Sequence, residues 1–196
     1  MAGEPEIKNR ILLAAKSLFA AQGFDATSVR QICEKAGANP ALVSYHFGGK
    51  HNMFCALFES YFPGTRLPEI DRLPGNAADK IRLLLTEVVH YRSSDPDMIA
   101  ILQREITTDS PRIDAIRNHV MPVWMMLRNL LEEGKDKGLF HYESLDNTLF
   151  FILGIVLFHR HTRYFQPLFS GERISTEKLA EDTCTFVFRG LGYEKK

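Results

Sequence analysis

The side chains whose types and spacing could do chemistry lie between residues 27 and 50. Thr27 and Ser28 are hydroxyl residues at the start of a short helical pattern, where a hydroxyl can cap the helix and the free backbone amides can receive a phosphate. Arg30 follows in the first turn, where its long side chain could reach a phosphate or the edge of a groove. Capping alone would also explain Ser28, so both roles stay open.

The next short segment carries a second group of candidates. Its inward face consists of three apolar residues, Leu42, Val43 and Phe47. The other side chains are candidates for reading base edges: Asn39, Ala41, Ser44 and Tyr45. An asparagine can bond adenine through two hydrogen bonds, an alanine can contact a thymine methyl group, and a serine can donate to a base or a phosphate. Tyr45 and His46 are also expected to bond phosphates, and Lys50 to add a cationic contact.

Three predicted helices would position these candidates. Apolar residues at three- and four-residue steps predict a first helix that stops at Gln22-Gly23. Ser28 precedes Gln31 by three residues, which is a capping-box pattern, and Gly37 offers a left-handed stop. Asn39-Pro40 then begins a helix that Gly48-Gly49 ends, although capping explains Asn39 as well as base reading does. Two short helices joined by a tight turn and packed on a longer one form a helix-turn-helix, whose second helix enters the DNA major groove.

The remaining sequence also predicts helices and no sheet. A fourth helix ends before Pro63, and residues 63–75 form the most linker-like stretch, so we expect domains at 1–62 and 63–196. Further helices are expected at about 76–92, 97–107, 110–138, 146–165 and 175–191. Pro122 predicts a kink or break near residues 118–121. The predicted fold class is therefore all-α, with about nine helices in an N-terminal helix-turn-helix domain and a C-terminal helical domain.

Charge and composition limit the possible functions. The 24 basic residues balance 24 acidic ones, and 45% of residues are hydrophobic, which excludes a generally basic protein that coats nucleic acid. Residues 1–50 carry a net charge of +2 and the remainder −2, so a localised nucleic-acid site is still allowed. The longest run without a charged residue, 147–159, is shorter than the 18 or more residues of a spanning helix. With no apolar signal segment in residues 1–10, a cytoplasmic, nucleoid-associated protein without a membrane partner is expected.

No catalytic, cofactor or metal chemistry is indicated. The sequence has no GxSxG, HExxH or GxxxxGK[ST] motif, since Gly48-Gly49-Lys50 is followed by His51. The three cysteines show no CxxC spacing. His159 and His161 would point about 200° apart on a helix, so we expect no metal site there.

The C-terminal half offers candidates for two other roles. An excess of apolar surface on two helices predicts a four-helix interface between two copies of the chain. Its expected residues are Leu149, Ile152, Leu153, Val156, Phe186 and Val187. Aromatic and polar side chains suggest an effector pocket, with Tyr91, Trp124, Phe151 and His159 as candidates. In both cases an ordinary hydrophobic core is the competing interpretation.

The segment from Thr27 to Phe54, TSVRQICEKAGANPALVSYHFGGKHNMF, resembles the DNA-binding domain of TetR family transcriptional regulators. The likeness covers the first 60 residues and includes Gly37 in the turn, Tyr45-His46-Phe47 at the end of the recognition helix, and Lys50. Ser44 stands where the family often has an aromatic residue. Residues 133–140 are similar to the family's usual helix end, and residues 103–120 and 132–140 are loosely similar to RefZ-type cell-division regulators.

This resemblance implies an all-helical homodimer that binds a near-palindromic DNA operator and is not an enzyme. It further implies a C-terminal domain that dimerises and usually holds a small-molecule effector, most often in a repressor. If a ligand acts allosterically, we expect the transition to pass through residues 63–75. The alternative is a DNA-binding protein without a small ligand, whose C-terminal domain contacts a protein partner. A helical binding protein that has lost DNA contact is a third possibility, against which the intact 27–50 segment argues.

Overall fold

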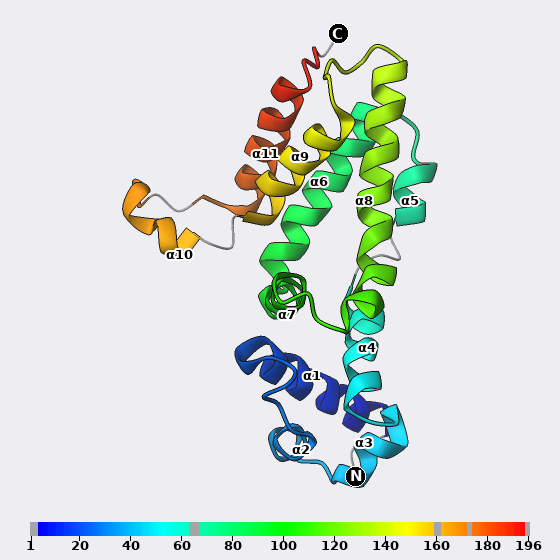
Figure 1. The fold of residues 1–196 in the computed structure, drawn as a ribbon, viewed down its shortest axis with the longest axis vertical. Helices are drawn as coiled ribbons and strands as arrows, with labels where there is room; N and C mark the ends of the chain where they lie inside the picture. The colour runs from blue at the N-terminus through cyan, green and yellow to red at the C-terminus, as the bar shows by residue number, and fades with distance from the viewer. Residues whose placement is uncertain (1–3, 63–66, 159–161, 172–173, 195–196) are drawn as a thin grey trace. The chain divides into compact units, whose positions relative to one another are not determined.

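A computed structural model describes residues 4–62, 67–158, 162–171 and 174–194 (Figure 1). Within these ranges the regular secondary structure is helical and contains no strand, which confirms the expected all-α fold class. The contacts of the chain divide it into two compact units. The first unit comprises residues 1–64 and 95–121, and the second comprises residues 65–94 and 122–196. Residues 95–121 therefore pack with the predicted DNA-binding segment, although the sequence grouped them with the C-terminal half.

The first unit is built around the N-terminal helix. It contains α1 (Glu4–Gln22), α2 (Val29–Ala36), α3 (Pro40–Phe47), α4 (Lys50–Tyr61), α7 (Pro96–Thr107) and the beginning of α8 (Ile113–Asp136). Helix α1 packs against α2, α4 and α7. Aromatic rings fill the centre, where Phe54 lies 5.8 Å from Phe19 and 5.3 Å from Phe58 between ring centroids. An ion pair of 2.9 Å between Lys16 and Asp95 attaches α1 to the residue that caps α7.

The second unit contains α5 (Leu67–Arg72), α6 (Ala77–Ser94), the rest of α8, α9 (Leu145–Phe158), α10 (Thr162–Phe165), the short 3₁₀ helix η3 (Gln166–Leu168) and α11 (Thr176–Gly190). Helix α6 packs against α5, α9 and α11, and α11 also packs against α9. Figure 1 shows α10 standing away from the helices α6, α9 and α11. The core of this unit includes Leu85, Leu127, Phe140, Val156 and Cys184.

The loop after α8 requires a glycine inside the helix. A Cβ atom at Gly134 would lie 2.0 Å from the ring of Phe140, far closer than two carbon atoms can approach. Gly134 therefore allows Phe140 to fold back onto the helix and become buried. The similarity of residues 133–140 to the usual helix end of the family therefore includes a glycine that the packing of Phe140 requires.

Three expectations about the helices need correction. Residues 63–75 are not all linker, because α5 forms where Ile70 is buried and Lys80 Nζ donates to the carbonyl oxygen of Asp71 at 2.6 Å. The helix expected at 146–165 is described as α9 up to Phe158 and as α10 from Thr162, and residues 159–161 lie outside the described ranges. No break occurs at 118–121, since α8 continues through Pro122. Pro122 is exposed while Val120 and Val123 are buried, so packing on either side holds the helix.

None of the helices in the described ranges is long and apolar enough to cross a membrane. Within the same ranges no group of three or more His, Cys, Asp or Glu side chains could hold a metal ion. Cys33, Cys55 and Cys184 are free thiols. Burial is the largest cause that raises the pKa of each of these thiols.

Candidate nucleic-acid interface

Both ends of α2 are held by specific polar contacts. The backbone N–H of Gln31 donates to Ser28 Oγ at 3.2 Å, and the backbone N–H of Ser28 donates to Gln31 Oε1 at 2.8 Å, which confirms the predicted capping box. At the other end, Arg10 of α1 donates to the carbonyl oxygens of Ala36 and Gly37. A cation at a helix C-terminus is favourable because the unpaired carbonyls are there. Arg10 was not among the sequence candidates, since nothing local links it to a helix 26 residues away.

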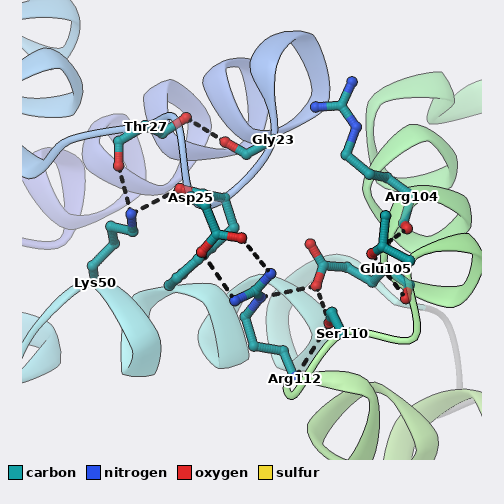
Figure 2. A network of polar contacts seen from close by, with 10 residues as sticks. Gly23, Asp25, Thr27, Lys50, Arg104, Glu105, Ser110 and Arg112 are labelled. Atoms are coloured by element: carbon teal, nitrogen blue, oxygen red, sulfur yellow. Dashed lines mark hydrogen bonds and ion pairs between the residues drawn. The ribbon is translucent and has the colours of Figure 1, made fainter.

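Thr27 has a structural position that the sequence did not reveal. Thr27 is only 1% exposed, and its hydroxyl donates to the carbonyl oxygen of Gly23 at 2.7 Å (Figure 2). Gln22 Nε2 also donates to this hydroxyl at 3.2 Å. The side chain therefore closes the loop between α1 and α2, and this role replaces the phosphate contact expected of its hydroxyl. Ser28 and Arg30, by contrast, are exposed.

Helix α3 presents the expected side chains to solvent. Asn39 Oδ1 accepts a hydrogen bond of 2.9 Å from the backbone N–H of Ala41, so Asn39 caps the helix, and Pro40 follows in the first turn. Val43 and Phe47 are buried beneath it. Three of the candidates share the opposite face at helical spacing and are exposed: Ala41, Ser44 and Tyr45. Tyr45 is 73% exposed.

His46 lies at the edge of this face. Its ring makes edge contacts with Tyr45 and Phe47, at centroid distances of 4.9 and 6.2 Å. Its Nε2 atom is enclosed and has no hydrogen-bond partner in the part of the chain that the structure describes. Nε2 therefore does not face solvent, and the expected phosphate contact of His46 does not use this atom.

Lys50 turns inward instead of outward. Its Nζ donates to the carbonyl oxygens of Phe24 and Thr27, and it lies 4.1 Å from the centroid of the Phe24 ring. Burial lowers the pKa of this ammonium, Arg112 acts in the same direction, and Asp25 opposes them. Lys50 therefore attaches α4 to the loop between α1 and α2, an arrangement that argues against the phosphate contact expected of it.

The expected effector residues do not come together. Tyr91 and Trp124 are half-buried, Phe151 is 70% exposed, and His159 lies outside the described residues. Hollows in the described part of the second unit include two of the size of small-molecule sites. The larger has a volume of about 720 Å³ and is lined by residues of α9, α10 and α11 and the segment between the last two. The smaller, of about 450 Å³, includes Phe151, but Tyr91 and Trp124 line neither.

The expected dimer residues point in different directions. Ile152, Val156 and Val187 are buried in the core of one copy, so they do not belong to an exposed face. Leu149 and Leu153 are half-buried, and Phe186 is 66% exposed. The exposed face of α9 lies about half a turn away, because successive residues are rotated by about 100°. It carries Phe150, Phe151, Gly154 and Phe158.

Comparison with known proteins agrees with this architecture. The model of a family described as bacterial regulatory proteins, tetR family, matches residues 11–57, which include α2, α3 and most of α4. The HTH-type transcriptional repressor NicS of Pseudomonas putida KT2440 is 25% identical over 198 residues, covering 94% of this chain and 92% of NicS. The probable HTH-type transcriptional regulator YttP of Bacillus subtilis 168 is 27% identical over 65% of this chain and 64% of its own.

A solved structure is also similar along nearly the whole chain. The crystal structure of HlyIIR, described as a hemolysin II transcriptional regulator, has a TM-score of 0.80 and 26% identity, covering 98% of this chain and 100% of that one. These relatives are transcriptional regulators and not enzymes. The helix-turn-helix geometry, the family match and the two full-length likenesses together place residues 11–57 in the tetR family of bacterial regulatory proteins, and the whole chain is similar to transcriptional regulators.

Proposed function

We propose that two copies of this chain form a repressor that binds a near-palindromic DNA operator through residues 39–47 and is released by a small-molecule effector. The observation that carries the DNA-binding part is the two-sided character of α3. Val43 and Phe47 anchor the helix, while Ala41, Ser44 and Tyr45 are exposed on the other side. Such a helix has a fixed orientation and a free polar face, which are the properties that reading a major groove requires.

Dimerisation is part of the proposal because one short helix makes too few contacts for specific binding. Two recognition helices related by a two-fold axis would reach successive major grooves about 34–36 Å apart. The exposed aromatic side chains of α9, together with Phe186 of α11, supply an apolar surface for the second copy. Fully burying a phenylalanine contributes about 1.5–3 kcal/mol, so this set can hold two copies together.

Two glycines on these helices favour close approach of a second copy. A Cβ atom at Gly154 or Gly190 would meet no other atom within 4 Å, so the backbone is uncovered at both positions. Gly154 lies between Phe150 and Phe158 on the same face of α9. A partner helix can therefore approach this face closely while the aromatic rings enclose it.

The effector part of the proposal depends on the larger hollow of the second unit. Most of its lining is apolar, with rings of Phe158, Phe165 and Phe169, and Asp182 and Thr183 provide polar groups. A volume of about 720 Å³ is within the usual size of small-molecule sites. The hollow shares Gly154, Phe158 and Phe186 with the surface proposed for the second copy, so the proposal requires the ligand to lie at the edge of that interface. The ligand class that fits is a mainly apolar molecule with one polar or cationic group.

Selection of duplexes from a random DNA library tests the DNA-binding proposal. The protein should enrich a defined sequence, and Tyr45→Ala should then bind the enriched duplex at least several-fold more weakly, because an exposed contact is lost. Ser60→Ala is the control, since Ser60 is exposed on α4 and lies outside the proposed interface. The proposal fails if no sequence is enriched, or if Tyr45→Ala and Ser60→Ala both bind like the wild type.

A further inference from the structure

The corner between α7 and α8 contains a buried ion pair that belongs to the first unit. Glu105 is 2% exposed and occupies the inward face of α7, in helical register with the buried Met98, Ile101 and Leu102. Arg112 is 9% exposed, and its Nε donates to Glu105 Oε2 at 2.8 Å. The hydroxyl of Ser110 donates to the same oxygen. Glu105 and Ser110 therefore fix the direction of the Arg112 side chain.

The other side of the same guanidinium reaches the loop between α1 and α2. Arg112 Nη1 and Nη2 donate to the two carboxylate oxygens of Asp25 at 3.3 and 3.2 Å (Figure 2). The guanidinium carbon also lies 4.2 Å from the centroid of the Phe24 ring. A two-pronged contact of this kind fixes orientation as well as distance, because both prongs must be aligned. The corner thus holds the loop through residues 87 positions apart in the sequence.

This loop sets the start of the helix-turn-helix. Lys50 binds the carbonyl oxygens of Phe24 and Thr27 from α4, while Arg112 binds Asp25 from the corner. Ser28, the residue that follows Thr27, caps α2. Since α2 packs against α3, the loop contributes to the placement of the recognition helix.

We propose that Arg112 is a positioning residue for DNA recognition, which acts through Asp25 to fix the loop before α2. The proposal rests on the DNA-binding function proposed above, and it adds a route by which the rest of the chain controls that function. The segment 95–121 is joined covalently to the second unit at both of its ends. Any rearrangement that moves the corner therefore changes the Arg112–Asp25 contact. This route is distinct from residues 63–75, through which the sequence alone suggested the signal would pass.

Asp25→Asn is the informative variant, because the Asp25 side chain is 83% exposed and its loss leaves no buried charge unpaired. Electrostatic repulsion and loss of positioning predict opposite changes in the DNA affinity of Asp25→Asn. Removing a negative charge from a DNA-binding unit should strengthen binding to every duplex by weakening repulsion of the phosphates. Loss of positioning should instead weaken binding to the enriched duplex by about five- to tenfold, the size typical of coupling between contacting residues, while binding to unrelated duplexes does not fall.

Asp114→Asn is the matched control. Asp114 is an exposed carboxylate of the same unit that pairs with Arg117 on its own helix, so the substitution changes the charge equally. It should leave the ratio of affinities for the enriched and unrelated duplexes unchanged. Asp25→Glu keeps a carboxylate and should recover part of the ratio that Asp25→Asn loses.

A double-mutant cycle with Arg112→Lys completes the test. Lysine keeps the charge but cannot make the two-pronged contact, so Arg112→Lys removes the same contact as Asp25→Asn. The variant that combines both substitutions should therefore lower the affinity ratio no more than either single substitution does. If Arg112→Lys does not fold, the Asp25 series decides alone. An unchanged affinity ratio for Asp25→Asn would overturn this inference and leave the proposed function intact. Failure of the wild type to enrich any duplex would instead contradict the proposed function.

Discussion

The Nζ atom of Lys50 lies 2.6 Å from the carbonyl oxygen of Thr27, so this ammonium is bound to the protein's own backbone. With a second bond of 2.7 Å to the carbonyl oxygen of Phe24, it attaches α4 to one loop, whose two acceptor residues lie 23 and 26 positions earlier in the sequence. We expect a lysine held in this way to act on DNA binding through the loop and not by neutralising a phosphate. Two variants separate these roles.

Lys50→Met should lower the free energy of unfolding by about 1–3 kcal/mol, because two carbonyl oxygens lose a charged donor. The slope of log affinity against log salt should stay unchanged, since no phosphate contact is lost. Thermal unfolding and salt titration of DNA binding measure the two quantities. A flatter slope with full stability would show that Lys50 contacts phosphate after all.

Arg30→Met serves as the comparison, because Arg30 is exposed on the first turn of α2. If it contacts a phosphate, the salt slope should decrease by about 0.9 for each copy, or about 1.8 for a dimer. Stability should change little, as is usual for an exposed side chain. An unchanged slope would remove Arg30 from the interface.

Asn39 has two possible roles that substitution can separate. Asn39→Ser keeps a good capping residue but loses the paired contact that asparagine can make with adenine. Its stability should match the wild type, whereas Asn39→Ala should lose about 1 kcal/mol with the cap. If Asn39 reads a base, both variants relax the preferred sequence at one position of each half-site. If it only caps, Asn39→Ser selects the wild-type sequence.

The proposed interface between two copies predicts a change in mass. The wild type should sediment at micromolar concentration with about twice the 22.4 kDa chain mass. Phe151→Gln combined with Phe186→Gln should give the single chain mass, because both side chains are exposed on one copy and would be buried in the dimer. Leu73→Gln is the control, an exposed apolar residue of the second unit on neither α9 nor α11. A dimeric double variant would place the interface elsewhere.

Local signals in the sequence predicted the helix-turn-helix well. Three signals each act only on residues within four positions in the sequence, so their effect can be predicted from the sequence alone. They are the capping box at Ser28, the left-handed Gly37 and the Asn39-Pro40 start. The inward residues Val43 and Phe47 follow from helical spacing in the same way. In the second unit, periodicity also predicted α6, α8, α9 and α11, but it did not predict α5.

Contacts between distant residues could not be read in this way. The sequence gives no direct sign that Lys50 turns toward Thr27 or that Arg112 reaches Asp25, since each depends on the packing of several helices. One signal was present but unused: Glu105 interrupts the apolar stripe of α7, and a buried carboxylate requires a partner. On α9, apolar residues occupy nearly the whole circumference, so composition could not distinguish the core face of Ile152 from the exposed face of Phe150.

We propose that a pair of α3 helices reads DNA through their exposed faces. The most direct measurement compares the sequences that the wild type and Ser44→Ala enrich from one random DNA library. The wild type should enrich two inverted half-sites whose centres are about 10 base pairs apart, and Ser44→Ala should relax the same position in both halves. A wild-type motif without two-fold symmetry, or an identical motif for the variant, would contradict this account.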